Sequence, residues 1–390
     1  MKSLVFLALA TLFFSLWGGA LRAAPVTKKK PASTAHSASV SGQTTIPHNN
    51  SSRRRKPATV WSPWHVSSFG EPAAGDNPMG EDRLVRAAAI EALGNFNGSV
   101  VVADPNSGRI LSIVNQKLAL SGAFTPCSTF KPVVAAAALR EGIISGNTRL
   151  QAEARFRYYY GTTRINVAQA LAYSSNEFFA KLGEMLGFRR VSHYAREFGL
   201  GEKAGLNIPS ESPGVFPLAP PKEGGVGLLT SFGQDIEYTP LQLAAVVSAI
   251  ANGGTLYYLQ YPRTPGEIES FRPEVHRRLV DIAPYLPEVR EGMAAVVREG
   301  TGRLAYNPDE EIFGKTGTCS EDGARLGWFA SYSSEERPKY VVVVLLRGGR
   351  MMFGPHAAEI AGRVYRGLPS KDKLATQGGG LVSFVGSGRK

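Results

Sequence analysis

The sequence predicts an α+β domain in which helices cover an antiparallel five-stranded sheet and an all-helical lobe is inserted between the second and third strands. Three observations lead to this fold class. A strand-turn-strand pattern lies near the start of the region 78–368, and three strand-like runs at short spacing lie near its end. The region between them consists mainly of helix-like segments.

The chain ends fall outside this domain. Residues 1–24 combine Lys2, an apolar run and two small residues, Ala23 and Ala24, which is typical of a secretory signal peptide. The apolar run also approaches spanning length, so an N-terminal anchor remains the alternative. Residues 25–77 form a basic, Ser- and Pro-rich segment for which we expect a disordered linker, and we expect a disordered tail at 369–390. The protein is therefore expected to be exported to the periplasm or another extracytoplasmic space.

The formal net charge of +12 comes from the two ends. Residues 1–60 carry nine Lys or Arg and no acidic residue, whereas the region 61–368 is neutral overall. Because the expected folded body has no basic excess, we expect no nucleic-acid partner. The basic runs Lys28–Lys30 and Arg53–Lys56 allow contact with a membrane or an anionic envelope surface, but solvated tails are the interpretation that we favour.

The elements of the first half follow in order along the chain. Apolar residues at helical spacing predict a helix over 81–93. A hairpin follows, with strands at 99–103 and 109–114 on either side of the turn sequence Asp104-Pro105-Asn106-Ser107-Gly108. An Ala-rich apolar run predicts a buried helix at 128–139. Two further helices are expected at 166–172 and 177–186, separated by a Tyr-Ser-Ser-Asn interruption.

The second half returns from helices to the sheet. Helices are predicted at 239–252 and 287–299. The three strand-like runs then follow at 312–318, 327–332 and 340–346, and a helix at 357–365 closes the domain. Two strands before the inserted lobe and three after it give the expected five.

Ser128-Thr129-Phe130-Lys131 stands at the start of the first buried helix, so the hydroxyl of Ser128 and the amine of Lys131 share one face. Such an amine can accept the hydroxyl proton if burial or a nearby cation lowers its pKa. The spacing alone is weak evidence, because Ser370–Lys373 and Ser387–Lys390 repeat it in the polar tail. The helix distinguishes the first occurrence from these two.

Two further motifs carry polar side chains. Ser174-Ser175-Asn176 lies between two helices, where it either faces a cleft or merely caps a helix. Lys315-Thr316-Gly317-Thr318 lies in a strand, where a glycine is unfavourable unless something approaches the backbone closely. A strand edge with a lysine and hydroxyls suits an anionic group, although an edge strand protected by a lysine would have the same pattern.

The order S-x-x-K, S-x-N, K-T-G on these elements is the combination found in penicillin-binding proteins and class A β-lactamases. The flanking sequences also resemble penicillin-binding transpeptidase domains over about 81–368. The matching stretches are Thr125–Pro132, Ala172–Asn176, Phe232–Gln234 followed by Thr239–Ala244, and Gly314–Thr318. The chain is therefore similar to serine D,D-peptidases of that family.

The resemblance implies roles for named residues. Ser128 would be acylated by a D-Ala-D-Ala peptide or a β-lactam, with Lys131 as the base. Ser174, helped by Lys315, would relay the proton to the leaving amine. The substrate contacts would come from Asn176, Thr316, Gly317 and Thr318, and the backbone N–H groups of Ser128 and Thr318 would form the oxyanion hole.

The two cysteines depart from the family pattern. Cys127 replaces the glycine that often precedes the nucleophile, and Cys319 follows Thr318 directly. If the two oxyanion donors converge on one oxygen, these cysteines must lie close together. We therefore expect a Cys127–Cys319 disulfide rather than two buried thiols, in keeping with export to an oxidising compartment.

The resemblance implies peptidoglycan stem peptides as substrates, β-lactam antibiotics as ligands, and no cofactor. The six histidines show no metal-ligand spacing. Three alternatives remain: a serine β-lactamase, a D,D-carboxypeptidase or endopeptidase, and a non-catalytic β-lactam sensor. No E-x-x-L-N run typical of class A β-lactamases occurs between Gly199 and Gly233, and class D enzymes have an apolar residue where Asn176 stands. Both differences favour a penicillin-binding protein that releases its acyl group slowly over a β-lactamase, and they do not separate a transpeptidase from a carboxypeptidase or endopeptidase.

Overall fold

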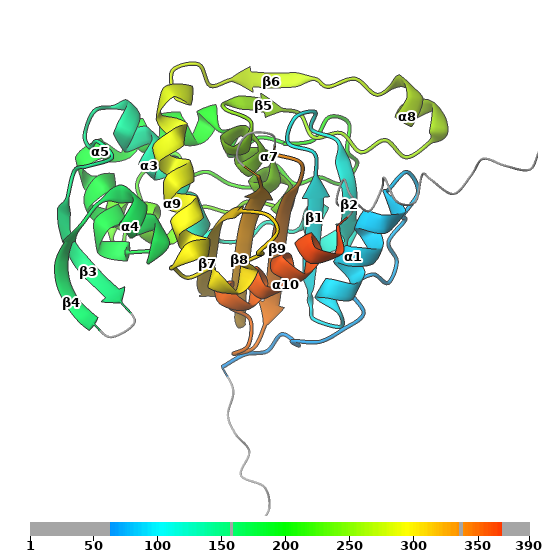
Figure 1. The fold of residues 1–390 in the computed structure, drawn as a ribbon, viewed down its shortest axis with the longest axis horizontal. Coiled ribbons are helices and arrows are strands. Elements are labelled where there is room, and N and C mark those ends of the chain that lie inside the picture. Colours follow the sequence, from blue (N-terminus) through cyan, green and yellow to red (C-terminus); the bar gives the residue numbers. More distant parts are fainter. Residues whose placement is uncertain (1–62, 157–158, 335–337, 369–390) are drawn as a thin grey trace, which may run out of the picture. The chain divides into compact units, whose positions relative to one another are not determined.

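The computed structural model describes residues 63–156, 159–334 and 338–368. The expected signal segment, the linker up to residue 62 and the tail 369–390 lie outside the described residues. The predicted fold class is confirmed: one antiparallel sheet of five strands is packed between helices, with a long insertion between its second and third strands (Figure 1).

The sheet has the strand order β2-β1-β9-β8-β7, and every neighbouring pair is antiparallel. Its strands are β1 (Gly98–Ala103), β2 (Ile110–Val114), β7 (Ile312–Glu321), β8 (Ala324–Ser333) and β9 (Val341–Gly348). The strand β9 at the centre of the sheet contains a continuous apolar run because both of its faces are buried, and its side chains from Val341 to Leu346 are fully covered. The strands before and after the insertion thus meet at the β1–β9 pair.

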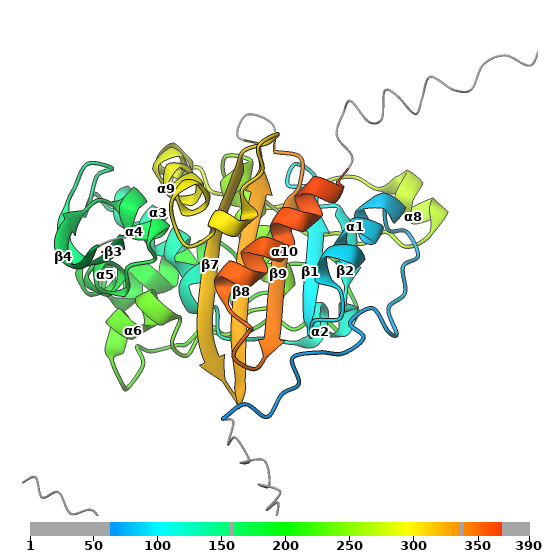
Figure 2. The same cartoon turned by 60° about the horizontal axis from the view of Figure 1, so that its bottom comes forward.

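Helices cover the sheet on both faces. On one face lie α1 (Arg83–Leu93) and α10 (Gly354–Gly367), which Figure 2 shows in front of the strands. Alternate residues of β8 locate the two layers, because Ser331 lies within hydrogen-bonding distance of Tyr365 on α10, whereas Trp328 packs against Tyr238 on the other side. That second side also carries α7 (Pro240–Ala251), in which every residue is buried.

Residues 116–311 form the insertion. Its helices are α2 (Gln116–Ser121), α3 (Lys131–Arg140), α4 (Val167–Ala172), α5 (Asn176–Glu197), α6 (Gly225–Phe232), α7, α8 (Pro265–Ser270) and α9 (Leu286–Arg298). The expectation of an all-helical lobe is wrong in one respect, because the insertion also contains the hairpin β3 (Leu150–Phe156) and β4 (Tyr159–Ile165) and the pair β5 (Thr255–Tyr257) and β6 (Val275–Arg278). The sequence of β4 is rich in Tyr and Thr, which favour strands.

The boundary of the expected linker also needs correction. Residues 63–77 make specific contacts with the domain rather than remaining apart from it. The backbone N–H of His65 donates to Gly323 over 2.7 Å, and Asp76 forms a 3.0 Å ion pair with Arg86. Asp76 also accepts the N–H groups of Asn115 and Gln116. The low apolar content of this stretch hid these contacts, because hydrogen bonds and charge hold it in place together with a few apolar contacts, such as that between Phe69 and Phe96.

Within the described part of the chain, no helix combines the length and the apolar character that a membrane crossing requires. The N-terminal apolar run lies outside that part.

Candidate active site

Ser128 lies in a short 3-10 helix, η1 (Cys127–Phe130), which continues directly into α3. The residues of α3 from Lys131 to Leu139 are all buried, so this helix is a fixed core element. Ser128 is half-buried, whereas the Lys131 side chain three residues later has no exposed surface. The helical spacing predicted for the hydroxyl and the amine is therefore realised on a rigid support.

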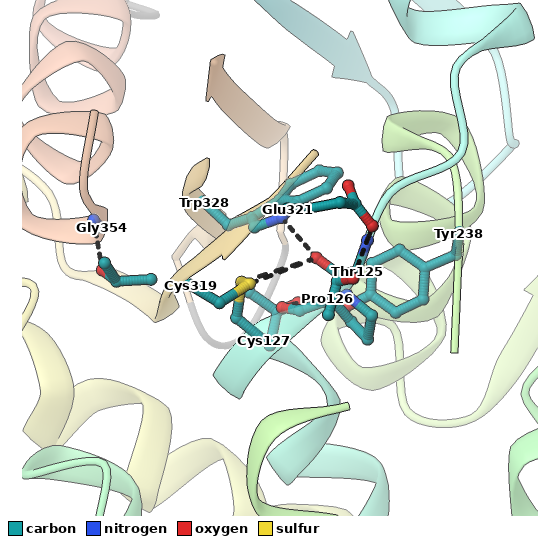
Figure 3. The surroundings of a disulfide bond; sticks show 10 residues. Thr125, Pro126, Cys127, Tyr238, Cys319, Glu321, Trp328 and Gly354 are labelled. Carbon is teal, nitrogen blue, oxygen red and sulfur yellow. Dashed lines mark hydrogen bonds between the residues drawn. A yellow bond between two sulfur atoms is a disulfide. The ribbon is translucent and has the colours of Figure 1, made fainter. Parts of the chain in front are cut away.

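The segment before Ser128 is bound to the end of β7 and to β8 (Figure 3). Thr125 donates its N–H and its hydroxyl to one carboxylate oxygen of Glu321, over 3.1 and 2.6 Å. The indole N–H of Trp328 donates to the Thr125 carbonyl over 3.0 Å. The predicted Cys127–Cys319 disulfide is present, with 5.6 Å between the two Cα atoms. Residues 128 and 318, which follow and precede these cysteines, are thereby held on neighbouring elements.

Cys127 adopts φ 53°, a left-handed conformation that a side chain disfavours by about 1–2 kcal/mol. A glycine would adopt it freely, which gives a physical reason for the glycine that often stands there in the family this sequence resembles. In this chain the covalent bond to Cys319 holds the residue in that conformation. The disulfide thus occupies a position where local backbone preference alone would favour a different residue.

Gly317 lets β7 approach the nucleophile segment closely. A Cβ atom at this position would lie 3.0 Å from the Pro126 carbonyl oxygen and 3.1 Å from the Thr129 methyl group. The strand glycine was expected to permit close approach of some group, and the backbone of Pro126, immediately before η1, is such a group. Its predicted role in substrate binding stays a prediction.

The Lys131 amine lies at the centre of a hydrogen-bond network. It donates to the Ser174 carbonyl over 2.8 Å, to the Ser174 hydroxyl over 3.3 Å and to the Asn176 side-chain oxygen over 2.6 Å. These bonds account for all three donors of an ammonium group, and none of them goes to Ser128. Ser174 has φ 57°, so the loop between α4 and α5 turns sharply at the residue whose hydroxyl enters this network.

Lys315 reaches the same hydroxyl from β7. Its amine donates to the Ser174 hydroxyl over 2.9 Å and to the Thr316 carbonyl over 3.0 Å. Burial lowers the pKa of Lys315 to about 7. Burial first, and the charge of Lys315 second, lower the pKa of Lys131 well below its usual 10.5. Both effects make it easier for Lys131 to lose its proton and become the neutral amine that can accept one from a nucleophile.

The two threonines of the third motif are also engaged. Thr316 shares a 2.5 Å hydrogen bond with the hydroxyl of Thr301, and the Thr318 hydroxyl oxygen accepts the N–H of Gly354, the first residue of α10, over 2.8 Å. The structure thus places Lys131, Ser174, Asn176 and Lys315 in one network. It places Ser128 and Thr318 next to the two ends of the disulfide.

Several residues of this neighbourhood were not predicted, namely Thr125, Glu321, Trp328, Tyr238 and Thr301. Their contacts join positions far apart in the chain, such as Thr125 and Glu321, which are separated by 196 positions. No local spacing indicates such pairs, although Thr125 lies in one of the stretches that resemble the family. Among the described residues there is no cluster of three or more His, Cys, Asp or Glu side chains suited to a metal ion.

Comparison with protein families matches residues 98–366 to the model described as the penicillin binding protein transpeptidase domain. The matched range begins at the first strand and ends in the last helix. It therefore spans the entire sheet, with the third motif on β7, and the insertion that carries the first two motifs.

Similar curated proteins include stage V sporulation protein D of Bacillus subtilis, which is 31% identical over 284 residues, covering 65% of this chain and 43% of the relative. The peptidoglycan D,D-transpeptidase MrdA of Acinetobacter baumannii is 25% identical over 353 residues, covering 73% of this chain and 52% of the relative. The chain thus spans about half the length of the curated relatives it matches. The transpeptidase domain of Burkholderia pseudomallei penicillin-binding protein 3 shares the fold, with a TM-score of 0.61 at 20% identity, over 75% of this chain and 95% of that domain.

Proposed function

The chain belongs to the penicillin-binding protein transpeptidase family, and from this premise we propose that it is a serine D,D-transpeptidase that acts on D-Ala-D-Ala stem peptides of peptidoglycan through an acyl-enzyme at Ser128. The observation that carries the proposal is the Ser174 hydroxyl, which accepts hydrogen bonds from both buried amines, Lys131 and Lys315, beside the helix that holds Ser128.

In the acylation step, the Ser128 oxygen attacks the carbonyl carbon of the penultimate D-Ala, and its proton passes to Lys131. A neutral amine has two N–H donors and one lone pair, so deprotonation releases one of the three hydrogen bonds of Lys131 and leaves a lone pair for that proton. The amide C–N bond then breaks, and the proton reaches the leaving D-Ala amine through the Ser174 hydroxyl, which Lys315 orients.

In the second step, the amine of a neighbouring stem peptide attacks the Ser128 ester, which forms the cross-link and releases the serine. Asn176 already uses its side-chain oxygen on Lys131, so its NH₂ group is the part that remains for the substrate amide. Thr316, the backbone of Gly317 and Thr318 contact the terminal carboxylate. The N–H groups of Ser128 and Thr318 stabilise the oxyanion. A β-lactam enters the same acylation step as a substrate analogue.

We also place the enzyme outside the cytoplasm, with residues 1–24 as the export signal or N-terminal anchor. The disulfide supports this location, because such bonds persist in oxidising compartments. A fusion of residues 1–77 to a reporter that matures only after export provides the test. Activity of the fusion that is lost on deletion of residues 1–24 would support export, and a fully cytoplasmic fusion would contradict it.

The acyl-enzyme is tested by labelling the purified protein with a fluorescent penicillin and following the label over time. We expect wild type to label covalently and to lose the label slowly, and Ser128→Ala to remain unlabelled. Ser370→Ala is the matched control, because Ser370–Lys373 has the same S-x-x-K spacing in the tail, and this variant should label like wild type.

Absence of label on wild type would contradict the acyltransferase and leave a degenerate scaffold. Rapid loss of the label would instead identify a β-lactamase. A purified stem peptide with and without an acceptor amine separates the remaining activities, because a transpeptidase forms a cross-linked product, whereas a carboxypeptidase only releases D-Ala.

A further inference from the structure

The turn Glu299–Arg303, which follows α9, lies against both the second and the third motif. The helix α9 packs on α4, which precedes Ser174, and on β7, which carries Lys315 (Figure 1). Within the turn, the backbone N–H of Thr301 donates to the Ala172 carbonyl over 3.0 Å. Its side-chain hydroxyl shares the 2.5 Å hydrogen bond with the hydroxyl of Thr316. A single residue therefore links the two elements through two different atoms.

The glycines on either side of Thr301 make this placement possible. A Cβ atom at Gly300 would clash with the Ala172 carbonyl, and one at Gly302 would lie 2.9 Å from Val296 and 3.0 Å from Phe329. Both glycines also donate backbone hydrogen bonds to the last turns of α9, over 3.0 and 2.9 Å. The position of Thr301 is therefore fixed by the end of α9 and not by its own side chain.

Thr316 and Thr318 each carry a hydroxyl group on β7. The two residues are two apart on β7, so their side chains leave the same face of the strand. The Thr318 oxygen accepts the N–H of Gly354, and this bond leaves the Thr318 proton available to another acceptor. If Thr301 donates to Thr316, the Thr316 proton is available in the same way. Two hydroxyl donors on one face then match the two oxygens of a carboxylate.

We propose that Thr301 is a positioning residue for the substrate carboxylate: its hydroxyl donates to Thr316, so that the Thr316 proton points to the bound anion. This inference rests on the proposed function, in which Thr316 and Thr318 bind the terminal carboxylate. Thr301 itself does not contact the substrate in this arrangement. It acts through Thr316, and its backbone bond to Ala172 keeps the loop that carries Ser174 at a fixed distance from β7.

The test measures the second-order rate constant of acylation by a fluorescent penicillin and by the methyl ester of the same compound, which lacks the anion. Thr301→Val removes the hydroxyl at constant shape, and Thr301→Ser restores it. With the free carboxylate we expect Thr301→Val to acylate roughly three- to tenfold more slowly than wild type, the loss of about one hydrogen bond. Thr301→Ser should stay within about twofold of wild type, and with the ester all three proteins should react at the same rate.

A double variant separates positioning from a general packing effect. If Thr301 acts through Thr316, adding Thr301→Val to Thr316→Val should cause little further loss, whereas independent effects would multiply. An equal loss with penicillin and its ester, multiplicative losses, or an unchanged rate in Thr301→Val would each overturn the inference. Each of these outcomes is interpreted only if wild type is labelled by the fluorescent penicillin. If wild type fails to label, the proposed function itself is contradicted, and this result differs from every outcome that would overturn the role of Thr301.

Discussion

The site has two sides, which we call walls: one is formed by the segment that carries Ser128, and the other by the loop that carries Ser174 and Asn176. The two walls are held in place by different interactions. The wall that carries Ser128 is tied to the sheet by a disulfide, by the Thr125–Glu321 hydrogen bonds and by the close approach at Gly317. The wall that carries Ser174 and Asn176 is joined to Lys131 and Lys315 through polar groups. The first wall contains a covalent link between the chain segments that carry Ser128 and Thr318, whereas the second contains the groups able to move a proton.

The covalent link and the buried amines affect different properties of the protein, namely the free energy of unfolding and the rate of the chemical step. A covalent cross-link constrains the unfolded chain and therefore raises the free energy of unfolding. Two buried amines do the opposite, because each must lose its hydration or its charge when the chain folds. We therefore expect loss of the disulfide to affect mainly the stability, and loss of a buried amine to affect mainly the rate of acylation.

The largest expected effect follows from Lys131→Met, which removes the proposed base at nearly constant side-chain length. Acylation by a fluorescent penicillin should slow by about 10²–10⁴-fold, the usual contribution of a positioned acid or base. The melting temperature should stay near that of wild type or rise, because the variant no longer buries an amine. An acylation rate within tenfold of wild type would show that another group accepts the proton.

The next effect concerns the disulfide. Replacing it with Cys127→Gly and Cys319→Ala together should lower the free energy of unfolding by about 2–5 kcal/mol, because the bond closes a loop between residues 192 apart in the sequence. Urea denaturation of both proteins measures this loss. Acylation should remain within about tenfold of wild type, since the groups that move the proton are unchanged.

The matched control for this variant is Cys127→Ala with Cys319→Ala, which also lacks the bond. Alanine must adopt the φ of 53° against its preference, so this protein should be about 1 kcal/mol less stable than the glycine variant. Equal stability of the two variants would mean that residue 127 relaxes to another conformation once the bond is absent.

The last effect is the pH dependence of stability conferred by Lys315. Its pKa falls from 10.5 in the unfolded chain to about 7 in the folded protein, so between these values the unfolded chain binds more protons. The free energy of unfolding should therefore rise with pH across this window, by up to about 1.4 kcal/mol for each pH unit. Below pH 7 both states are protonated and the contribution is constant.

Urea denaturation of wild type and Lys315→Met between pH 7.5 and 9.5 measures this contribution together with the effect of the Lys315 charge on Lys131, and both act in the same direction. The stability of wild type relative to the variant should increase with pH. A constant difference would mean that Lys315 keeps its usual pKa in the folded protein.

The sequence predicted the elements that bear chemical motifs because those motifs impose local patterns. The motif with Ser128 and Lys131 was predicted at the start of a helix, and the motif with Lys315 and Gly317 was predicted in a strand. The structure contains both elements. The Cys127–Cys319 bond followed from two roles that the resemblance implied for neighbouring residues, and it is confirmed. In these cases the motif in each short segment carries enough information.

The features that sequence reasoning missed depend on contacts between distant segments. The run Leu150–Arg155 contains Ala, Glu and Arg, which favour helices, and it forms a strand by pairing with the β-forming residues of β4. Thr301 stands in an ordinary Gly-Thr-Gly turn, and its importance depends on Ala172 and Thr316, which lie on two other elements. Such partners become visible only once the chain is folded.

The disulfide has a topological consequence. Because it joins Cys127 to Cys319, the intervening chain, including α3, the Ser174 loop, α9 and most of β7, is part of a closed covalent ring. A protease that nicks this ring once opens it without releasing a fragment, so the serine nucleophile and the strand beside it stay in one molecule until the bond is reduced. In an environment rich in proteases, a single cut in the ring therefore does not separate Ser128 from the strand that carries Lys315 and Thr318.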